Sequence, residues 1–450
     1  MNHFNTPSQV AGRHHAKISA LQQPSAETVA YADKLKALNR HELGPGKIAL
    51  AEWEQAGLRL PDLQQIRAYR LERVRAELRK HDCAGIVLYD PVNVRYATDS
   101  TNMQVWVTHN AARYAFIATE GPVIIFEFEA CAHLNLHNPL IDEIRPTKAW
   151  FYLVSGDRIE EHAQIWAAEV ADLVKQYGGG NSRLAIDRCN YEGLMELVRH
   201  GVEFYNGETI MELAREIKSE EEIVAMRCAI EACERSIDVM RDHFVPGVLE
   251  QELWGHLHSA NIARGGEWIE TRIMSSGPRT NPWYQECSSR EIENGDFMAF
   301  DTDLIGSYGM CVDISRTWLC GDKPPTAAQK DIYQRAHEQI MRNTELLVPG
   351  ALYSDLTHQS FQYDPNEFNT YTVLYHGVGM CDEAPAIYFP SAWDAYGWEG
   401  TLQPGMVICV ESYVGRKTGG EGVKLEDQIL ITETGYEKLN RYRYEEKLLK

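Results

Sequence analysis

Acidic side chains and one histidine recur in the C-terminal half of the chain in an order that suits a metal site. The set is Asp301, Asp303, Asp313, His376, Glu411 and Glu426. Buried carboxylates need a partner, and carboxylate oxygens with a single imidazole suit divalent iron, manganese, cobalt or zinc. We therefore expect these six residues to bind metal, and the set is large enough for two ions.

A predicted hairpin would bring the three aspartates together. The hydrophobic run 298–305 is strand-like, and the two-residue period of a strand puts Asp301 and Asp303 on the same face. Residues 306–309 are turn formers, and the short apolar run after them reads as the returning strand. This strand would carry Asp313 back opposite the first pair.

A second predicted hairpin would pair the two glutamates. Residues 406–411 form a β-rich run, 419–422 a glycine-rich loop, and 423–429 a returning strand. Glu411 and Glu426 would then face each other. The competing interpretation is that each carboxylate is a solvated surface group; it suits any one of them, but not the whole set within hydrophobic strands.

Composition favours a soluble globular protein of two domains. The chain has 450 residues, of which 44% are hydrophobic and 24% charged. Its formal net charge of -21 argues against nucleic acid or an anionic membrane as the main partner, and favours a small-molecule substrate. No run approaches the roughly 20 apolar residues that span a bilayer, and the N-terminus lacks the apolar core of a secretion signal. We expect a cytoplasmic protein.

The cysteines are predicted to be reduced and structural. The chain has 10 of them, and no two form a C-x-x-C pair. Cys228, Cys233, Cys311 and Cys409 stand at apolar positions of helix or strand patterns, where a thiol packs as a small hydrophobic group.

Three segments follow one another along the chain. Residues 1–60 are polar and helix-permissive, and we expect a helical extension. Residues 61–212 alternate helical and β-rich runs, beginning with an amphipathic helix over 63–80, and predict an α/β domain. In residues 213–450 a capping box beginning at Ser219 opens a long helix, and the pattern predicts helices packed on antiparallel sheet.

Several ordered motifs resemble the creatinase/prolidase/methionine aminopeptidase superfamily over about residues 65–440. They are Asp90-Pro91-Val92-Asn93-Val94-Arg95-Tyr96, Ile217-Lys218-Ser219 with Glu222, Asp313-Ile314-Ser315-Arg316-Thr317, His376-Gly377-Val378-Gly379 and Gly420-x-Gly422-Val423-x-x-Glu426-Asp427. The resemblance implies an α/β creatinase-like N-terminal domain and an α+β pita-bread C-terminal domain. It also implies two divalent ions, with iron favoured over manganese, cobalt and zinc, and a homodimer.

The departures from the peptidase pattern point to another reaction. One histidine of these peptidases belongs to a segment that here reads Asn281-Pro282-Trp283-Tyr284, and a second is replaced by Asp382, aligned through Glu383-Ala384-Pro385. The family's arginine in the last metal motif is Lys424, and the usual Glu-Pro-Gly reads Glu411-Ser412-Tyr413. These changes are similar to the non-peptidase branch that cleaves dimethylsulfoniopropionate to dimethyl sulfide and acrylate.

The resemblance assigns roles to the residues of the site. The substrate is a small zwitterion, and its β-elimination needs a base for the proton next to the carboxylate, which the metal would hold. Asp382 is the candidate base; the competing interpretation is an aspartate that caps a loop or supports the ligands. A sulfonium is recognised by aromatic faces, each contributing on the order of 1 kcal/mol.

The candidate aromatic residues are Tyr371, Trp283, Tyr284 and Trp106. Tyr371 is expected on the same strand as His376, and Trp106 would come from the N-terminal domain of the same or a partner subunit. Ordinary packing is the alternative for each single ring.

Other functions remain open from the sequence. An Xaa-Pro metallopeptidase of the prolidase or aminopeptidase P type fits the fold and the ligands but lacks the two histidines. A catalytically inert binding module would not need an intact ligand set, and a creatinase-like amidine hydrolase works without metal. Metal analysis and the two substrates separate these possibilities.

Overall fold

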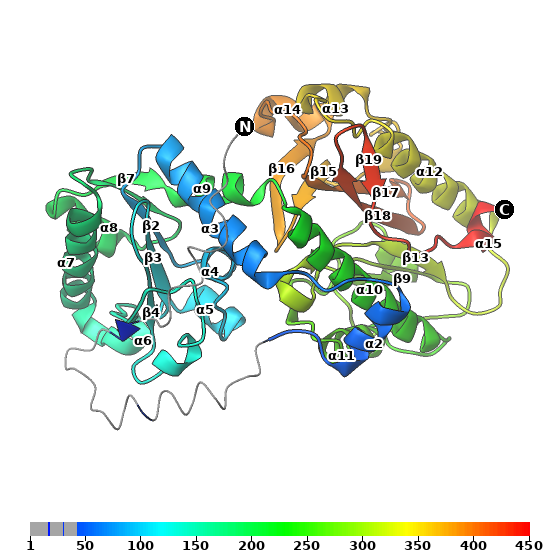
Figure 1. Cartoon of the computed structure of the whole chain (residues 1–450). Helices are drawn as coiled ribbons and strands as arrows, with labels where there is room; N and C mark the ends of the chain where they lie inside the picture. The colour runs from blue at the N-terminus through cyan, green and yellow to red at the C-terminus, as the bar shows by residue number, and fades with distance from the viewer. Residues whose placement is uncertain (1–16, 19–29, 31–42) are drawn as a thin grey trace. The chain divides into compact units, whose positions relative to one another are not determined.

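The computed structural model describes residues 17–18, 30 and 43–450, which divide into two compact units (Figure 1). The first unit holds residues 63–215 and the short strand β1, and the second holds residues 43–62 and 216–450. The helical extension expected over 1–60 lies mostly outside the described residues. Its last part contains α2 (Lys47–Gln55), whose Trp53 packs with Cys228 inside the second unit.

The first unit is built on a seven-stranded sheet in the order β1-β5-β4-β3-β2-β6-β7. Its strands are β1 (Lys17–Ile18), β2 (Gly85–Leu88), β3 (Tyr114–Ala118), β4 (Val123–Glu127), β5 (Glu143–Pro146), β6 (Arg183–Ile186) and β7 (Glu203–Asn206). Its helices are α3 (Leu63–Lys80), α4 (Pro91–Thr98), α5 (Gln104–His109), α6 (Tyr152–Ser155), α7 (Ile159–Tyr177), α8 (Tyr191–Arg199) and α9 (Gly207–Arg215).

Both parallel and antiparallel pairs occur in this sheet. Strand β2 pairs in parallel with β6 and antiparallel with β3. Helix α7 turns a buried stripe that includes Trp166 and Val170 toward the sheet, where it packs with Phe116 and Leu184. The alternation of helices and β-rich runs therefore predicted the α/β class correctly.

The second unit combines long helices with antiparallel sheets. Its further helices are α10 (Glu220–Asp242), α11 (Glu250–Ala263), α12 (Ala327–Thr344), α13 (Tyr353–Gln359), α14 (Pro390–Tyr396) and α15 (Glu446–Leu449). Its strands are β8 (Trp268–Ile269), β9 (Met274–Ser276), β10 (Phe297–Phe300), β11 (Leu304–Ile305), β12 (Cys311–Val312), β13 (Arg316–Leu319), β14 (Phe368–Asn369), β15 (Val373–Val378), β16 (Asp382–Tyr388), β17 (Val407–Arg416), β18 (Gly422–Ile431) and β19 (Tyr436–Lys438).

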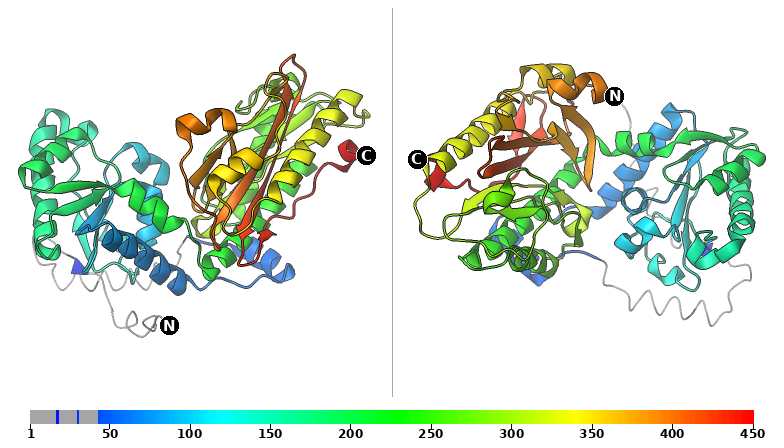
Figure 2. Two further views of the ribbon diagram at one scale, coloured as in Figure 1. Left: turned by 90° about the horizontal axis from the view of Figure 1, so that it is seen from above. Right: turned by 180° about the vertical axis from the view of Figure 1, so that it is seen from behind.

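The largest sheet of the second unit has two different faces. Its strand order is β16-β15-β17-β18-β19, with β14 paired to β17. Along β17 the side chains of Ile408 and Val410 join the core formed with α12, which lies along this sheet (Figure 2). Because side chains alternate along a strand, Cys409 and Glu411 turn to the opposite face. The sheet thus separates a hydrophobic core from a polar site.

Helix α10 begins where the sequence predicted it. Ser219 accepts a hydrogen bond from the backbone N–H of Glu222, and the Glu222 carboxylate accepts one from the Ser219 N–H, which completes the capping box. Ile223, Met226 and Ile230 on the same helix are buried. One face of the helix that the capping box predicted therefore belongs to the core of the second unit.

Candidate metal centre

The two predicted hairpins are present, and the first differs from its prediction in one respect. Strands β11 and β12 pair with Leu304 opposite Val312, so that Asp313 follows the returning strand. Asp301 and Asp303, however, lie between β10 and β11, not on one continuous strand, and Asp303 has a left-handed backbone with φ of 38°. A short aspartate side chain tolerates that conformation better than most residues.

The break in the strand does not separate the aspartates. Asp301, Asp303 and Asp313 are all buried, and each offers a carboxylate oxygen that lies within 4.8 Å of the others. The kink therefore replaces strand alternation as the device that brings Asp301 and Asp303 to one place. Both remain candidate ligands.

The second hairpin supplies the two glutamates as predicted. Strands β17 and β18 pair over their whole length, and Glu411 stands directly opposite Glu426. Both side chains are fully buried. Gly419 and Gly420 take positive φ angles of 101° and 90° in the loop between the strands, a conformation that glycine adopts without strain.

His376 on β15 turns one ring nitrogen toward the carboxylates. Its Nε2 lies 3.3 Å from Glu411 Oε1, 3.4 Å from Glu426 Oε1 and 3.6 Å from Asp313 Oδ2. Its Nδ1 lies 3.0 Å from the carbonyl oxygen of Gly377, which can only accept, so Nδ1 donates. A histidine fixed in this way presents Nε2 as a metal ligand.

Lys424 brings a positive charge into the same cluster. Its Nζ lies 3.0 Å from Asp301 Oδ2 and 2.8 Å from both Glu411 Oε2 and Glu426 Oε2, and it donates to Ser315 Oγ at 2.7 Å. The lysine side chain is fully buried. Burial lowers the pKa of Lys424, but the three carboxylates outweigh it and hold the pKa well above its usual value.

The pKa values of the carboxylates show an excess of negative charge. Burial, with neighbouring carboxylates, raises the pKa of Asp303 and of Asp313 well above the usual range, and burial with Glu426 raises the pKa of Glu411 to about 7. For Glu426, burial is outweighed by Lys424 and His376, and its pKa is held well below its usual value. The cluster therefore favours an additional cation.

The oxygen atoms of this cluster fit a bound divalent ion. Within the described part of the chain, Asp313 Oδ1, Glu411 Oε1 and Glu426 Oε1 are buried without a hydrogen-bond partner. Such oxygens are costly in a protein interior unless something else coordinates them. Carboxylates together with the imidazole of His376 are donors that divalent transition metals accept.

Cys409 belongs to this cluster, although its position in an apolar run assigned it to packing. Its sulfur and ligand atoms of Asp313, His376 and Glu426 all lie within 4.8 Å of one another. It stands opposite His376 in the pairing of β15 with β17. The thiol therefore lines the candidate metal centre as well as filling space.

Asp382 lies at the open side of the cluster. Its Oδ1 is 3.7 Å from Nδ1 of His376, and its side chain is 58% exposed, in contrast to the buried ligands. Part of the side chain stays in contact with solvent, but the protein groups that surround the carboxylate displace water from it and raise the pKa of Asp382, with Glu426 and Glu383 acting in the same direction and His376 and Lys424 opposing them. A carboxylate that is accessible and adjacent to the cluster can reach a bound substrate.

Two of the candidate aromatic residues lie together beside Lys424. The rings of Tyr284 and Tyr371 stack with centroids 5.1 Å apart, and Nζ of Lys424 lies 4.5 Å from the centroid of Tyr371. Tyr371 was expected on the same strand as His376, and this expectation is wrong. Strand β15 begins only at Val373, so Tyr371 precedes the strand that carries His376. Tyr284 is 47% exposed and donates to or accepts from Thr372 Oγ1 at 2.6 Å.

The other two aromatic residues are placed differently. Trp283 is buried and stacks on Tyr413 with centroids 5.8 Å apart, so its ring is a packing element behind Tyr371. Trp106 belongs to the first unit, where it packs against Phe128 and Phe151. Its contact with substrate stays a prediction.

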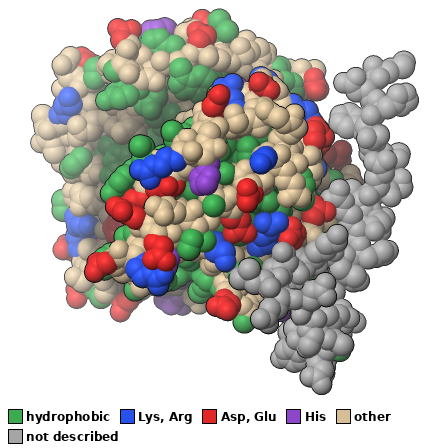
Figure 3. All heavy atoms as spheres, turned by 90° about the vertical axis from the view of Figure 1, so that its left-hand side faces the viewer, with side chains coloured by type: hydrophobic (Ala, Val, Ile, Leu, Met, Phe, Trp, Pro, Cys, Tyr) green, Lys and Arg blue, Asp and Glu red, His purple; other side chains and the backbone are tan. Residues whose placement is uncertain are grey.

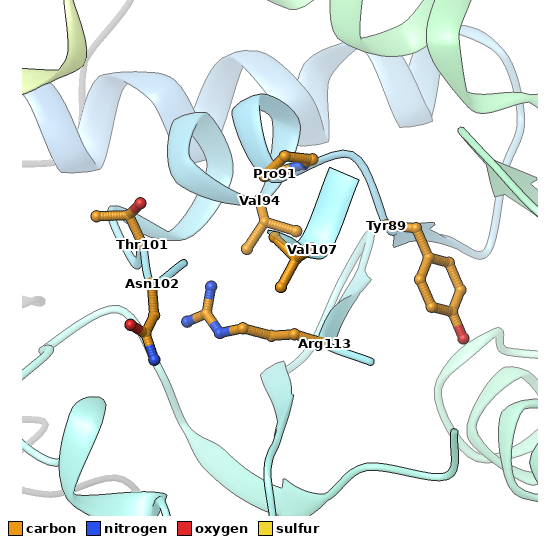
Figure 4. A pocket seen from close by; sticks show the side chains of 7 residues that line it. All are labelled: Tyr89, Pro91, Val94, Thr101, Asn102, Val107 and Arg113. Carbon is orange, nitrogen blue, oxygen red and sulfur yellow. The ribbon is translucent and has the colours of Figure 1, made fainter. Parts of the chain in front are cut away.

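The first unit has a pocket of its own (Figure 4), which Arg113 lines together with Thr101 and Val107. The guanidinium of Arg113 donates to Glu127 Oε2 at 2.7 Å and to the carbonyl oxygen of Ser100 at 3.3 Å. The charge of Arg113 is therefore already balanced by Glu127, and the pocket does not offer it to a ligand.

Comparison with known proteins identifies the family. Residues 224–433 match the metallopeptidase family M24, and residues 70–217 match the creatinase/prolidase N-terminal domain. Dimethylsulfoniopropionate lyase DddP of Roseovarius nubinhibens is 46% identical over 418 residues, which cover 91% of this chain and 94% of that protein. The chain belongs to the DddP family. The DddP protein of Roseobacter denitrificans is 41% identical, with 92% and 94% covered.

The fold of this chain is that of solved peptidases. An Xaa-Pro dipeptidase from Bacillus anthracis superposes with a TM-score of 0.66 at 23% identity and covers 84% of this chain and 98% of its own. The pita-bread architecture expected from the motifs is confirmed, with a creatinase-type N-terminal unit before it. The M24 family consists of enzymes that use divalent metal ions, and the buried cluster of carboxylates with His376 fits such an ion.

The sequence singled out Lys424 only as a departure from the peptidase motif and Cys409 only as a packing residue, and it gave no role in the site to Ser315. Cys409 stands two residues before Glu411 on a strand, and Lys424 stands two before Glu426, so the period of two places each beside a ligand. That signal was available for both. Ser315 Oγ accepts a hydrogen bond from Nζ of Lys424 and donates one to Glu426 Oε2 at 2.9 Å. Ser315 and Glu426 are 111 residues apart, so no local sequence pattern predicts this contact.

Proposed function

We propose that the protein is a metal-dependent carbon–sulfur lyase that cleaves dimethylsulfoniopropionate by β-elimination to dimethyl sulfide and acrylate. Support comes from the two DddP relatives and from the site itself. The observation that carries the mechanism is the accessible carboxylate of Asp382, 3.7 Å from the proposed ligand His376, at the position where the peptidases of this fold have a histidine.

Asp382 is the proposed general base. Its carboxylate takes the proton from the carbon next to the substrate carboxylate, and the electron pair of that C–H bond forms the new carbon–carbon double bond. The Cβ–S bond breaks as the double bond forms, and its electrons leave on sulfur as neutral dimethyl sulfide. The raised pKa of Asp382 suits a base that must hold this proton.

The proposed ligands are Asp301, Asp303, Asp313, His376, Glu411 and Glu426. A divalent ion bound among them supplies Lewis-acid polarisation of the substrate carboxylate, which stabilises the charge that develops during proton removal. Lys424 keeps the carboxylates of Asp301, Glu411 and Glu426 turned toward one point. We propose two ions, with iron favoured over manganese, cobalt and zinc.

Recognition of the sulfonium is assigned to aromatic rings. Tyr284 and Tyr371 form a stacked pair at the site, and the exposed ring of Tyr284 is the one that a ligand reaches. Tyr284 has a positive φ of 70°, which is strained for a bulky residue and is typical of functional sites. Trp283 supports this pair from behind, and Trp106 is proposed to complete the enclosure from a first unit.

The charge of the rest of the molecule is compatible with a small zwitterionic substrate. The net charge is -21, and the face of the first unit in Figure 3 shows acidic and basic side chains interspersed. None of the described helices is long and apolar enough to cross a bilayer. We propose a homodimer in the cytoplasm with no nucleic-acid or membrane partner.

The test is headspace gas chromatography on purified, metal-analysed protein mixed with dimethylsulfoniopropionate, with an Xaa-Pro dipeptide assayed in parallel. Dimethyl sulfide with equimolar acrylate supports the lyase. Proline release from the dipeptide without dimethyl sulfide would instead assign the chain to the peptidases whose fold it shares.

A further inference from the structure

The direction in which the Asp382 side chain points depends on the turn that precedes this residue. Asp382 is the first residue of β16 and pairs with Val378 of β15 across a tight turn. Its side chain is mostly exposed, so packing around that side chain does not fix its position. Whatever holds the backbone of the turn therefore holds the carboxylate.

The buried side chain of Glu383, the next residue, holds this turn through hydrogen bonds. Its side chain is 1% exposed, and Oε1 accepts a hydrogen bond from the backbone N–H of Met380 at 3.0 Å. Oε2 accepts one from Nζ of Lys218 at 2.8 Å. A single carboxylate thus joins the turn to the segment that leads into α10.

Lys218 is held as firmly as its partner. Its side chain is 4% exposed, and its backbone N–H donates to the carbonyl oxygen of Gly405 at 2.9 Å. Its Nζ also lies 3.4 Å from the carbonyl oxygen of Glu216. The Lys218–Glu383 pair therefore ties the turn to a fixed point of the second unit.

Because side chains alternate along β16, the anchored Glu383 side chain sets the direction in which the Asp382 side chain points. Neighbouring residues of a strand point to opposite faces, and here Glu383 is buried while Asp382 is exposed. Gly379 leaves room for the Glu383 carboxylate under the turn, because a Cβ at that position would lie 2.5 Å from the carboxylate oxygens. With Glu383 fixed inward, Asp382 is fixed toward His376.

We propose that Lys218 and Glu383 are positioning residues that aim the Asp382 carboxylate at the substrate proton. This inference rests on the proposed function of Asp382 as the general base. A misplacement of about 1 Å costs on the order of 100-fold in rate, because proton transfer needs close approach. Loss of the pair is expected to reduce kcat by about that factor and to leave KM and metal content unchanged.

The experiment compares full-length Lys218→Met, Lys218→Arg and Asp382→Asn with the wild type. The readouts are kcat, KM, metal content and the deuterium isotope effect on dimethyl sulfide release, with the substrate labelled at the carbon next to its carboxylate. Lys218→Met is expected to have a lower kcat and a larger isotope effect than the wild type, because proton removal is the step that slows. Lys218→Arg keeps the charge and is expected to recover part of kcat.

Arg113→Met is the matched control. It breaks a buried pair in the first unit whose exposed fractions, 4% and 1%, equal those of Lys218 and Glu383. A merely structural loss lowers the amount of folded enzyme without changing the isotope effect, and Arg113→Met is expected to behave in that way. The same behaviour of Lys218→Met would overturn the proposal.

Two further outcomes separate the positioning role from the base role. Wild-type kcat in Lys218→Met, with an inactive Asp382→Asn, would overturn the positioning role alone. Full turnover by Asp382→Asn would refute the base and the positioning role together. If Lys218→Met does not fold, a wild-type isotope effect and kcat in both Lys218→Arg and a Glu383→Gln variant would overturn the proposal.

Discussion

Replacement of Lys424 by methionine is expected to destabilise the metal-free protein strongly. Methionine has a similar length and no charge, so the substitution removes the ammonium group that lies 2.8–3.0 Å from three carboxylates and leaves the packing volume nearly intact. His376 is then the one remaining cationic side chain that the structure shows against the buried glutamates. The cluster of negative charge loses its main internal compensation.

The size of the effect follows from burial. Removal of one partner from a fully buried ion pair lowers the free energy of unfolding by about 3–5 kcal/mol. For a domain of roughly 250 residues, such as the second unit, this lowers Tm by roughly 6–20 °C. Protonation of Glu411, whose pKa is already about 7, limits the loss below that pH. Lys424 lowers the pKa of Glu411 in the wild type, so its removal raises that pKa further, and the destabilisation is expected to grow as pH rises from 7 to 8 and Glu411 loses its proton.

The assay is differential scanning calorimetry of chelator-treated protein at pH 8, repeated with added divalent ion. The ion supplies the charge that the variant lacks, so the rise in Tm on metal addition is expected to be larger for Lys424→Met than for the wild type. Lys424→Arg is the control that keeps the charge and is expected to melt near the wild type. A metal-free Lys424→Met protein that melts at or above the wild-type Tm would refute the electrostatic account of the cluster.

Three further predictions concern pH, substrate recognition and metal. Glu411 has a pKa of about 7 in the fold against 4.5 unfolded; its contribution is fully present below pH 4.5 and is lost as pH rises through 7, so metal-free stability falls by about 3 kcal/mol over that window, and a flat urea-unfolding profile from pH 5 to 8 would contradict this. Tyr284→Ala is expected to raise KM about fivefold, for the loss of about 1 kcal/mol of cation–π attraction, whereas Tyr396→Ala, which removes another exposed tyrosine ring on α14, keeps the wild-type KM; equal values for both variants would remove Tyr284 from the site. Chelation is expected to abolish dimethyl sulfide release and re-addition of one divalent metal to restore it, and activity that survives in protein shown to be metal-free would contradict the Lewis-acid role.

The sequence predicted those parts of the fold that depend on local periodicity. The capping box at Ser219, the α/β alternation of the first unit and the pairing of Glu411 with Glu426 are all set by residues close together in the chain, so their pattern is visible without coordinates. The same periodicity misplaced Asp301 and Asp303 on one strand. The left-handed backbone at Asp303 is imposed by the surrounding structure, and hydrophobic spacing carries no trace of it.

Long-range contacts were beyond the sequence for a physical reason. Lys218 and Glu383 meet across 165 residues and Lys424 and Asp301 across 123, and such pairs follow only from the final packing of the sheets. Tyr371 and Tyr284 were selected as aromatic candidates, yet their stacking beside Lys424 could not be inferred from their positions. What the residue types did indicate was the charge of the site and the absence of the peptidase histidine at Asp382.

The most direct test measures dimethyl sulfide release by the wild type and by Asp382→Asn at equal, measured metal content. Asparagine keeps the shape of the side chain and removes its ability to take a proton. The account predicts dimethyl sulfide with equimolar acrylate from the wild type and none from the variant. Wild-type release by Asp382→Asn, or loss of its metal, would contradict the assignment of Asp382 as the base.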